Sequence, residues 1–310
     1  MESKDYYVRT EEGEITRCSL RGRYKKQYEL KKNKQSVLDI VCVGDGVDFE
    51  KSGDDAGVIT NIYERKNFIS RKAPKIKGAT FRGGRLEQII ASNIDYFFIV
   101  SSFDEPRFNN RVVDRFLVVA ESSKVTPIII INKVDLDDDN DIQEWVKIYK
   151  KIGYNVIKTS VETGYNINKL VKLVKGKTSI FWGQSGVGKS SLLNKIYPQL
   201  DLRVGEVSDY SNKGKHTTVS VKMLCMEEDS YLIDTPGIRE IDPYGIRQED
   251  LGHYFTEFYP HHLECRFNTC THNHEPGCAI EKKVEEGIIS PYRYESYLNI
   301  LHTIEDDMLF

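Results

Sequence analysis

The sequence predicts a mixed α/β fold, in which a doubly wound parallel sheet follows a small β-rich part and precedes a short helical part. Three observations support this. Short apolar runs separated by turn residues dominate up to about residue 69. Nearly continuous apolar runs then alternate with amphipathic stretches between residues 95 and 196, as in repeated βα units. After residue 243 the chain is mostly helical in period and holds three closely spaced cysteines.

The first part has the pattern of a small antiparallel barrel or sheet. An apolar run at residues 37–43 leads into a glycine turn, and residues 47–50 alternate with period two. Another turn precedes the apolar run at 57–63. Strands at this spacing are typical of a five-stranded OB-type barrel, which we expect over residues 1–72. Such barrels often bind nucleic acid, so we expect this part to contact RNA.

Charge is distributed unevenly along the chain. Residues 1–85 carry 19 Lys and Arg against 13 Asp and Glu, whereas the remaining residues carry 25 against 34, for a net charge of −3. A basic first quarter favours a polyanionic partner. Residues 71–85 form a basic segment with glycine and proline, which we interpret either as a linker that touches phosphates or as a solvated linker.

Composition excludes several classes of protein. With 39% hydrophobic and 29% charged residues the chain can bury a core, unlike a disordered protein. No run of eighteen apolar residues is present, and the charged residues 1–5 lack the apolar segment of a secretory signal. Six cysteines in 310 residues are too few for a disulfide scaffold. We therefore expect a cytoplasmic monomer without membrane contact.

The middle part consists of alternating strands and helices. Buried strands are expected at residues 95–100, 126–131, 155–159 and 178–182. Helices are expected at residues 110–120, 142–151, 167–174 and 191–196. In a doubly wound sheet of this kind, ligands bind at the carboxyl ends of the strands.

A glycine-rich segment links the strand at 178–182 to the next helix and fits the pattern G-x-x-x-x-G-K-[ST]. Backbone N–H groups of such a loop surround phosphate oxygens, and the helix N-terminus adds a positive end. Lys189 would reach the β- and γ-phosphates, and the Ser190 hydroxyl would bind Mg²⁺. The predicted phosphate-binding residues are Gly183, Gln184, Ser185, Gly186, Val187, Gly188, Lys189, Ser190 and Ser191.

The tetrapeptide N-K-V-D at residues 132–135 follows a predicted buried strand and indicates guanine. The Asp135 carboxylate can accept hydrogen bonds from guanine N1–H and the 2-amino group. Adenine offers neither donor, so a buried Asp135 would be left unpaired against it, at a cost of about 1–3 kcal/mol. Asn132 would lie near the O6/N7 edge of the base, and the stem of Lys133 would cover the ring.

Two further segments would complete a site for GTP with Mg²⁺. An apolar strand from residue 231 ends in D-T-P-G, where Asp234 would hold Mg²⁺ through water and the Gly237 N–H would meet the γ-phosphate. A polar loop before it contains Thr217 and Thr218. One of these threonines is expected to complete the Mg²⁺ shell, and the sequence leaves open which.

The order of these motifs is unusual. The base-reading tetrapeptide at 132–135 comes first, followed by Thr159 and Ser160, which could contact guanine O6 through their backbone. The phosphate loop at 183–190 and D-T-P-G at 234–237 come later. Ordinary GTPases have the phosphate loop first. The same sheet can form if the old termini are joined and new ends are opened elsewhere, which is a circular permutation.

Cysteines near the C-terminus have the spacing of a metal site. Cys265, Cys270 and Cys278 belong to a C-x4-C-x-H-x5-C pattern. Three thiolates and one imidazole suit tetrahedral Zn²⁺ with every position filled, hence a structural ion. The region holds several candidate imidazoles: His272, His274, His261 and His262. The remaining cysteines are expected in the core: Cys18, Cys42 and Cys225.

These motifs and their order resemble the circularly permuted, ribosome small-subunit-dependent GTPases of the RsgA/YjeQ family. The similarity covers nearly the whole chain, including residues 204–208 and 214–218. It implies an OB-fold domain over residues 1–72, a permuted GTPase domain over 73–242 and a helical zinc-binding domain over 243–310. It also implies slow GTP hydrolysis accelerated by the small ribosomal subunit, binding to its 16S rRNA, and a role in its late maturation. The family pattern assigns His272 as the nitrogen ligand of one zinc ion.

Catalysis poses a separate question. Many GTPases orient the attacking water with a Gln just after D-x-x-G, but this position is Ile238 here. Intrinsic hydrolysis is therefore expected to be slow. His216, beside Thr217 and Thr218, is the nearest residue in the sequence that could orient water, and the resemblance supports it as catalytic.

Two other classes of function remain open at this stage. The protein could hold GDP or GTP with scarcely any turnover and act as a placeholder, which Ile238 would favour. It could instead be an ATP- or GTP-dependent enzyme on a small molecule, with the zinc module at its active site. The filled coordination shell argues against a zinc module at an active site, because no position on the ion is left for a substrate. A departure from the family is Val161, where a small residue often follows the serine.

Overall fold

The computed structural model describes residues 5–22, 40–53, 56–72, 87–202, 221–227, 229–234 and 245–304. The chain divides into two compact units, Met1–Asn93 and Ile94–Phe310. The domain boundaries expected at residues 72 and 242 stay predictions. Among the described helices, none has the length and apolar composition needed to cross a bilayer.

The first unit contains two small sheets. The four-stranded sheet has the order β1-β2-β4-β3, and its strands are β1 (Tyr6–Arg9), β2 (Ile15–Leu20), β3 (Val47–Lys51) and β4 (Ala56–Ile62). The pairs β1–β2 and β3–β4 are antiparallel as expected, but β2 and β4 are parallel. A purely antiparallel arrangement was therefore wrong here. The long connection between Leu20 and Ala56 permits the crossover that parallel neighbours require.

A hairpin-like pair, β5 (Phe68–Lys72) and β6 (Glu87–Ser92), forms the second sheet. Arg71 and Lys72, expected in a linker, therefore belong to a strand, and the rest of that predicted linker lies outside the described residues. The predicted strand at 37–43 is described only from residue 40, where Val43 makes an isolated bridge to Ala91. Closure into an OB-type barrel stays a prediction.

Side chains from the two central strands of the first sheet, together with Val41, form its small core. Cys18, Leu20, Val41 and Ile59 are buried together. Beside them, the buried Asp45 carboxylate accepts two hydrogen bonds from Arg65, both 2.7 Å long. The expectation of a core position is confirmed for Cys18, whereas Cys42 and Cys225 are half-buried.

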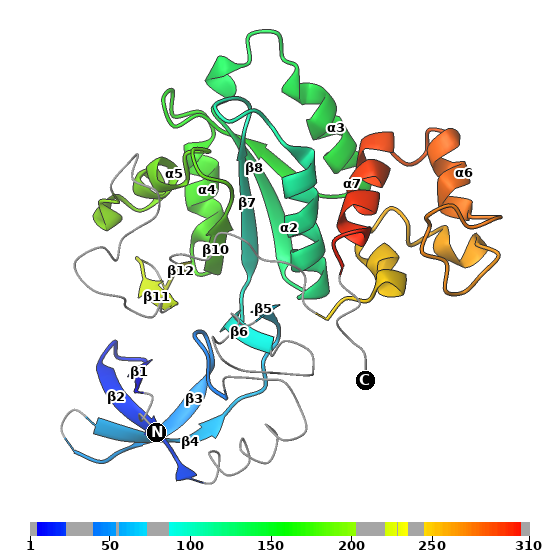
Figure 1. Cartoon of the computed structure of the whole chain (residues 1–310). Helices are drawn as coiled ribbons and strands as arrows, with labels where there is room; N and C mark the ends of the chain where they lie inside the picture. Colours follow the sequence, from blue (N-terminus) through cyan, green and yellow to red (C-terminus); the bar gives the residue numbers. More distant parts are fainter. Residues whose placement is uncertain are drawn as a thin grey trace, which may run out of the picture. The chain divides into compact units, whose positions relative to one another are not determined.

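A six-stranded sheet organises the second unit (Figure 1). Its order is β11-β12-β10-β7-β8-β9, and every neighbouring pair is parallel except β11–β12. The strands are β7 (Tyr96–Ser102), β8 (Thr126–Asn132), β9 (Asn155–Lys158), β10 (Thr178–Trp182), β11 (Lys222–Cys225) and β12 (Tyr231–Asp234). This confirms the predicted doubly wound α/β sheet and adds β11, which the sequence pattern did not indicate.

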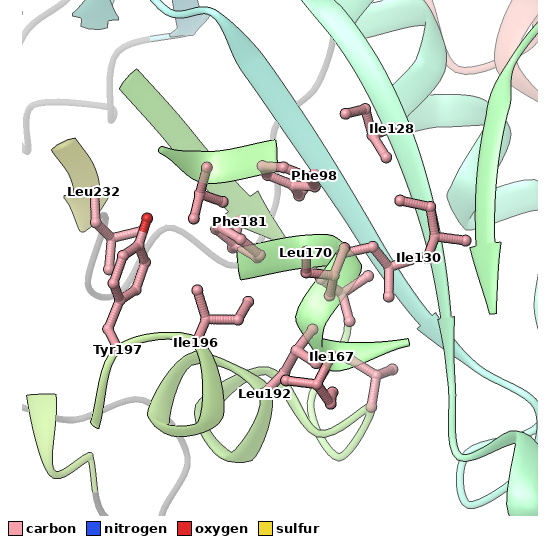
Figure 2. Packing of buried hydrophobic residues seen from close by; sticks show 14 residues of the cluster. Phe98, Ile128, Ile130, Ile167, Leu170, Phe181, Leu192, Ile196, Tyr197 and Leu232 are labelled. Carbon is pink, nitrogen blue, oxygen red and sulfur yellow. The ribbon is translucent and has the colours of Figure 1, made fainter. Parts of the chain in front are cut away.

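Helices cover both faces of this sheet: α2 (Asn110–Ser122), α3 (Ile142–Ile152), α4 (Ile167–Val174) and α5 (Lys189–Ile196). The Asn109 side chain caps α2 by accepting a hydrogen bond from the Arg111 N–H, and Gly153 ends α3 in the left-handed region, where glycine is favoured. On the α4 and α5 face, Leu170 and Leu192 pack toward Phe98 and Ile130 of the strands (Figure 2). This packing of α4 and α5 on the strands holds the carboxyl ends of the strands in place.

Short 3-10 turns and two helices complete the unit. The turns are η1 (Val134–Leu136), η2 (Pro198–Leu200), η3 (Gln248–Tyr254) and η4 (His262–Glu264), and the helices are α6 (Ala279–Glu285) and α7 (Pro291–Leu301). The segment after residue 243, expected to be mostly helical, contains short turns as well as these helices, and α7 ends at Leu301. Residues 305–310 lie outside the described part.

Helix α7 packs on α2 through a buried ionic cluster that sequence reasoning missed. The Arg293 guanidinium donates to Asp114 and, at 2.7 Å, to Glu257. Tyr149 of α3 donates to the same Asp114 carboxylate at 2.8 Å. Arg293 also stacks over the Phe255 ring, 4.5 Å from its centroid. Because buried charges are stable only when paired, this cluster fixes the C-terminal segment against the helices of the sheet.

Candidate functional site

Four strands of the large sheet bring the predicted nucleotide-binding segments to one edge. β8, β9, β10 and β12 are linked into one parallel array through β7. Their carboxyl ends carry residues 132–135, 159–160, 183–190 and 234 respectively. Parallel strands end at the same edge of a sheet, so segments distant in sequence become neighbours there.

The glycine-rich loop between β10 and α5 has room for an anion because its glycines lack side chains. A Cβ on Gly183 would lie 2.0 Å from the Val100 carbonyl oxygen. Gly188 has a φ of +89°, and a Cβ there would lie 2.5 Å from Asn132 Nδ2. Both approaches are too close for any other residue, so the backbone of the loop can lie against its neighbours and curve around a phosphate group.

Lys189 begins α5 and folds back over this loop. Its ammonium donates to the carbonyl oxygens of Gly183 at 2.6 Å and Gln184 at 2.8 Å. Burial lowers the pKa of Lys189 to about 8. The cation therefore lies within the loop that the sequence predicts for phosphates, and a phosphate anion beside it would raise that pKa again.

Asn132 joins three of the four segments. Its Nδ2 donates to the Val187 carbonyl of the glycine loop at 3.0 Å, and its Oδ1 accepts from the Thr159 hydroxyl at 3.1 Å. All of these groups are buried. In the structure its amide holds the neighbouring loops together, and its position near the O6/N7 edge of the base stays a prediction.

Lys133 and Asp135, the other two polar residues of the N-K-V-D tetrapeptide, are more exposed than Asn132. Lys133 has a φ of +59° and donates from Nζ to the Glu105 carbonyl oxygen. Asp135 lies in η1 with an exposed carboxylate. Asp135 is therefore not buried as the sequence argument assumed. The cost of leaving its carboxylate unpaired against adenine arises only when a bound base covers it.

The loop after β9 is held by its own hydrogen bonds. Thr159 and Ser160 are buried. The Ser160 N–H donates to the Tyr165 carbonyl at 3.2 Å, and its hydroxyl accepts from the Thr163 N–H at 3.1 Å. The Val134 N–H donates to the Thr159 carbonyl at 3.2 Å. These bonds give the predicted guanine-facing segment a defined conformation.

Some of the remaining predicted nucleotide ligands are described by the structure, and others lie outside the described residues. Asp234 ends β12 and is half-buried, as are Ser190 and Ser191 in the first turn of α5, whereas Ser185 is exposed. Four predicted residues lie outside the described part of the chain: His216, Thr217, Thr218 and Gly237.

Three cysteines and one histidine gather in the C-terminal segment. The ligand atoms of Cys265, Cys270, His272 and Cys278 all lie within 4.8 Å of one another. His272 Nδ1 is 3.6 Å from the sulfur of Cys265 and 3.5 Å from that of Cys278. Neighbouring ligand atoms around a tetrahedral zinc ion are about 3.5–3.8 Å apart, so this donor set fits Zn²⁺ in both chemistry and spacing.

The imidazole of His272 is placed for coordination. Burial lowers the pKa of His272 to about 4, so the ring is neutral at pH 7, which is the form that binds metals. Its Nδ1 faces the thiols, whereas Nε2 faces Gly252. His274, the alternative, is 85% exposed at its side chain and lies 3.7 Å from Glu281 instead.

Helix α7 also supports this cluster from behind. The Tyr297 hydroxyl donates to the Thr271 carbonyl at 2.6 Å, and the Tyr294 hydroxyl donates to the His272 carbonyl at 2.8 Å. Tyrosines and Arg293 alternate in the segment P-Y-R-Y-E-S-Y. This concentration of rings around a single arginine was the signal in the sequence for a buried interface.

Comparisons with known proteins agree with this geometry. The family model "RsgA GTPase" matches residues 62–244. The small ribosomal subunit biogenesis GTPase RsgA of Chlorobaculum tepidum is 41% identical over 272 residues, covering 86% of each chain. The protein of that name from Chlorobaculum parvum is 39% identical, covering 97% of this chain and 95% of the relative.

Two solved structures are similar over nearly their whole length. YjeQ from Thermotoga maritima has a TM-score of 0.76 at 33% identity, covering 96% of this chain and 93% of its own. YloQ, described as a circularly permuted GTPase, has a TM-score of 0.71 at 30% identity, covering 97% of this chain and 91% of its own.

Proposed function

The chain belongs to the RsgA GTPase family, and we propose that it hydrolyses GTP on the small ribosomal subunit during the late maturation of that subunit. Its relatives are named for biogenesis of this subunit. One observation carries the proposal: Asn132 hydrogen-bonds both to the phosphate loop at Val187 and to the loop at Thr159. These bonds support a single site that combines the predicted base-reading segment with the predicted phosphate loop, in reversed chain order.

The nucleotide would lie across the carboxyl edge of the large sheet. The glycine loop and Lys189 would hold its phosphates, and Asp135 would accept hydrogen bonds from guanine N1–H and the 2-amino group. The backbone of Thr159 and Ser160 would face O6. The Ser190 hydroxyl would ligate Mg²⁺, with Asp234 acting through water. When bound, this ion supplies positive charge to the phosphate oxygens.

Hydrolysis requires a water molecule held in line with the γ-phosphate. Ile238 cannot orient it because its side chain has no polar atom. We assign this positioning role to His216, with Thr217 or Thr218 completing the Mg²⁺ shell and the Gly237 N–H meeting the γ-phosphate. Slow intrinsic turnover would follow from Ile238, which cannot orient the water, and the bound subunit would stimulate turnover by placing His216 against that water.

The cysteine–histidine cluster would hold one structural zinc ion through Cys265, Cys270, His272 and Cys278. The 3.5 and 3.6 Å spacings around His272 Nδ1 support this assignment. Elemental analysis is expected to find about one zinc per chain. A folded, zinc-free protein whose unfolding midpoint is unchanged by chelator would exclude a structural ion.

The other parts of the chain would provide contacts to RNA. The basic residues 1–85, with the predicted barrel over 1–72, suit the phosphates of 16S rRNA, and the zinc-binding segment over 243–310 would provide a second contact. We propose that the protein acts in the cytoplasm as a monomer that exchanges GTP and GDP.

The test is GTP turnover measured with small and large ribosomal subunits added separately. Small subunits are expected to raise the turnover number steeply, whereas large subunits leave it at the intrinsic rate. Equal stimulation by both subunits, or none by the small one, would refute the proposed partner. A preference for ATP over GTP in a binding titration would refute the assignment of the base.

A further inference from the structure

A groove at the outer edge of the large sheet has features that the nucleotide site does not use. It crosses β9, the last strand of the sheet, between α3 and the start of α4, with a volume of about 150 Å³. Lys150, Lys158 and Lys169 line it, together with Tyr165. Among the described residues that line the groove there is no aspartate or glutamate.

Its charge contrasts with the surrounding chain. Residues 86–310 hold 25 Lys and Arg against 34 Asp and Glu, yet every charged residue that lines the groove is a lysine. Lys150 and Lys169 are exposed, and within the described part of the chain neither forms an ion pair with a carboxylate. Among the described residues, the Lys158 ammonium has one side-chain partner, Gln143, through a long hydrogen bond of 3.4 Å. Three ammonium groups without a local counter-charge favour an anionic ligand.

An aromatic ring lies beside these cations. Tyr165 is 50% exposed, although its backbone is fixed because its carbonyl accepts the Ser160 N–H. Asn166 fixes the other side by donating from Nδ2 to the Lys158 carbonyl at 2.8 Å. A partly exposed ring on a rigid loop beside clustered lysines is the combination that single-stranded nucleic acids use, with a base stacked on the ring and phosphates near the cations.

We propose that this groove binds a single-stranded or looped segment of RNA, with one base on Tyr165 and the adjoining phosphates near Lys150, Lys158 and Lys169. The inference rests on the proposed function, since the subunit would supply the RNA. The groove shares the loop 159–166 with the predicted guanine-facing segment, so RNA bound there would lie next to the nucleotide site.

The test measures binding of a fluorescein-labelled, single-stranded 12-nucleotide RNA to the full-length protein by anisotropy, between 50 and 200 mM NaCl. Two variants have the same total change of charge: Lys150→Glu/Lys169→Glu in the groove, and Lys195→Glu/Lys222→Glu at exposed positions of the same unit outside it. We expect the groove variant to bind RNA about tenfold more weakly or worse. The magnitude of its salt slope is expected to fall by about 1.4, for two lost phosphate contacts.

The ring is tested separately from the charges. Tyr165→Ala is expected to weaken RNA binding about 5- to 150-fold, corresponding to the loss of one stacked base, whereas Tyr165→Phe keeps the affinity because stacking needs no hydroxyl. GTP affinity without RNA stays unchanged in all these variants, which shows that the loop is intact.

The proposal would be overturned if the groove variant bound RNA as well as the unmodified protein, or if the control variant lost as much affinity. It would also be overturned if polyglutamate bound as strongly as RNA and Tyr165→Ala left that binding unchanged. Stimulation by small subunits is measured in parallel on the unmodified protein. If stimulation is present and the groove variant still binds RNA normally, the groove inference fails and the proposed function stands. If the unmodified protein is not stimulated, the proposed function fails and the groove inference falls with it.

Discussion

The nucleotide edge of the large sheet and the cysteine–histidine cluster are built in opposite ways. At the nucleotide edge, segments from residue 132 to residue 234 meet because strand order places them together. Glycines and neutral hydrogen bonds, such as that between Asn132 and Val187, hold them. The cluster lies within the short stretch from Cys265 to Cys278 and is backed by tyrosines of α7, a helix that a buried ion pair joins to α2. The first site depends on the whole domain, and the second depends on a local turn that one helix fixes in place.

The largest effect that would test this difference between the two sites is expected at Lys189, on the nucleotide edge. Lys189→Ala removes the cation that lies in the phosphate loop, where charge-assisted hydrogen bonds contribute about 1.5–3 kcal/mol each. With two such bonds to phosphates, GTP affinity is expected to fall about 100-fold to 10,000-fold in a titration with a fluorescent GTP analogue. Lys195→Ala, an exposed position on the same helix, is the control and should bind as before.

The buried charges that hold α7 against α2 provide the second test. Arg293→Met leaves Asp114 and Glu257 buried without their cation, which is expected to cost about 3–5 kcal/mol in the free energy of unfolding. The matched control is Arg111→Met, since Arg111 joins the same two helices through an exposed ion pair with Glu295; it should cost under about 1 kcal/mol. Urea denaturation measures both. Similar losses in the two variants would show that Arg293 does not anchor α7.

A third test concerns the water-positioning role assigned to His216. His216→Ala is expected to lower subunit-stimulated turnover about 100-fold or more, as for loss of a positioned polar group, while GTP affinity stays nearly intact. Single-turnover assays with small subunits measure the rate. An unchanged stimulated rate would remove His216 from the mechanism.

The lowered pKa of Lys189 predicts a pH dependence at the nucleotide edge alone. With a pKa of about 8 in the free protein, the lysine is charged at pH 7 and mostly neutral at pH 9. Because phosphate binding favours the charged form, affinity for GTP is nearly constant up to about pH 7, falls about twofold by pH 8 and about tenfold by pH 9. The same titration on Lys189→Ala should lack this decline. If both proteins show the same pH profile, another group is responsible.

The smallest expected effect is at the back of the cluster. Tyr297→Phe removes the hydrogen bond to the Thr271 carbonyl and is expected to cost about 1 kcal/mol in the free energy of unfolding, as for one buried hydrogen bond. Tyr259→Phe, at a residue 66% exposed, is the control and should have no measurable effect. Zinc affinity by competition with a chelator would decrease only in the first variant, if α7 supports the cluster as we infer.

Sequence reasoning was most accurate where the signal is local. The apolar runs at β8 and β10 and the periodic stretches at α2 and α3 became elements within a few residues of their predicted bounds. Accuracy fell where partners from distant parts of the chain decide. The parallel pairing of β2 with β4 and the antiparallel edge strand β11 depend on such partners, and a run of residues does not reveal which neighbour it will pair with.

For this protein, the sequence alone determined the chemistry available: a glycine loop, an N-K-V-D tetrapeptide, and thiols at metal-binding spacing. The identity and spacing of side chains decide which atoms can bind phosphate, guanine or zinc, and both are local. The tertiary structure decided how those groups meet. In it, Asn132 hydrogen-bonds to a neighbouring loop, Arg293 forms a buried ion pair, and three lysines lie beside Tyr165. Contacts of this kind between distant residues arise only when the sheet and its helices are packed.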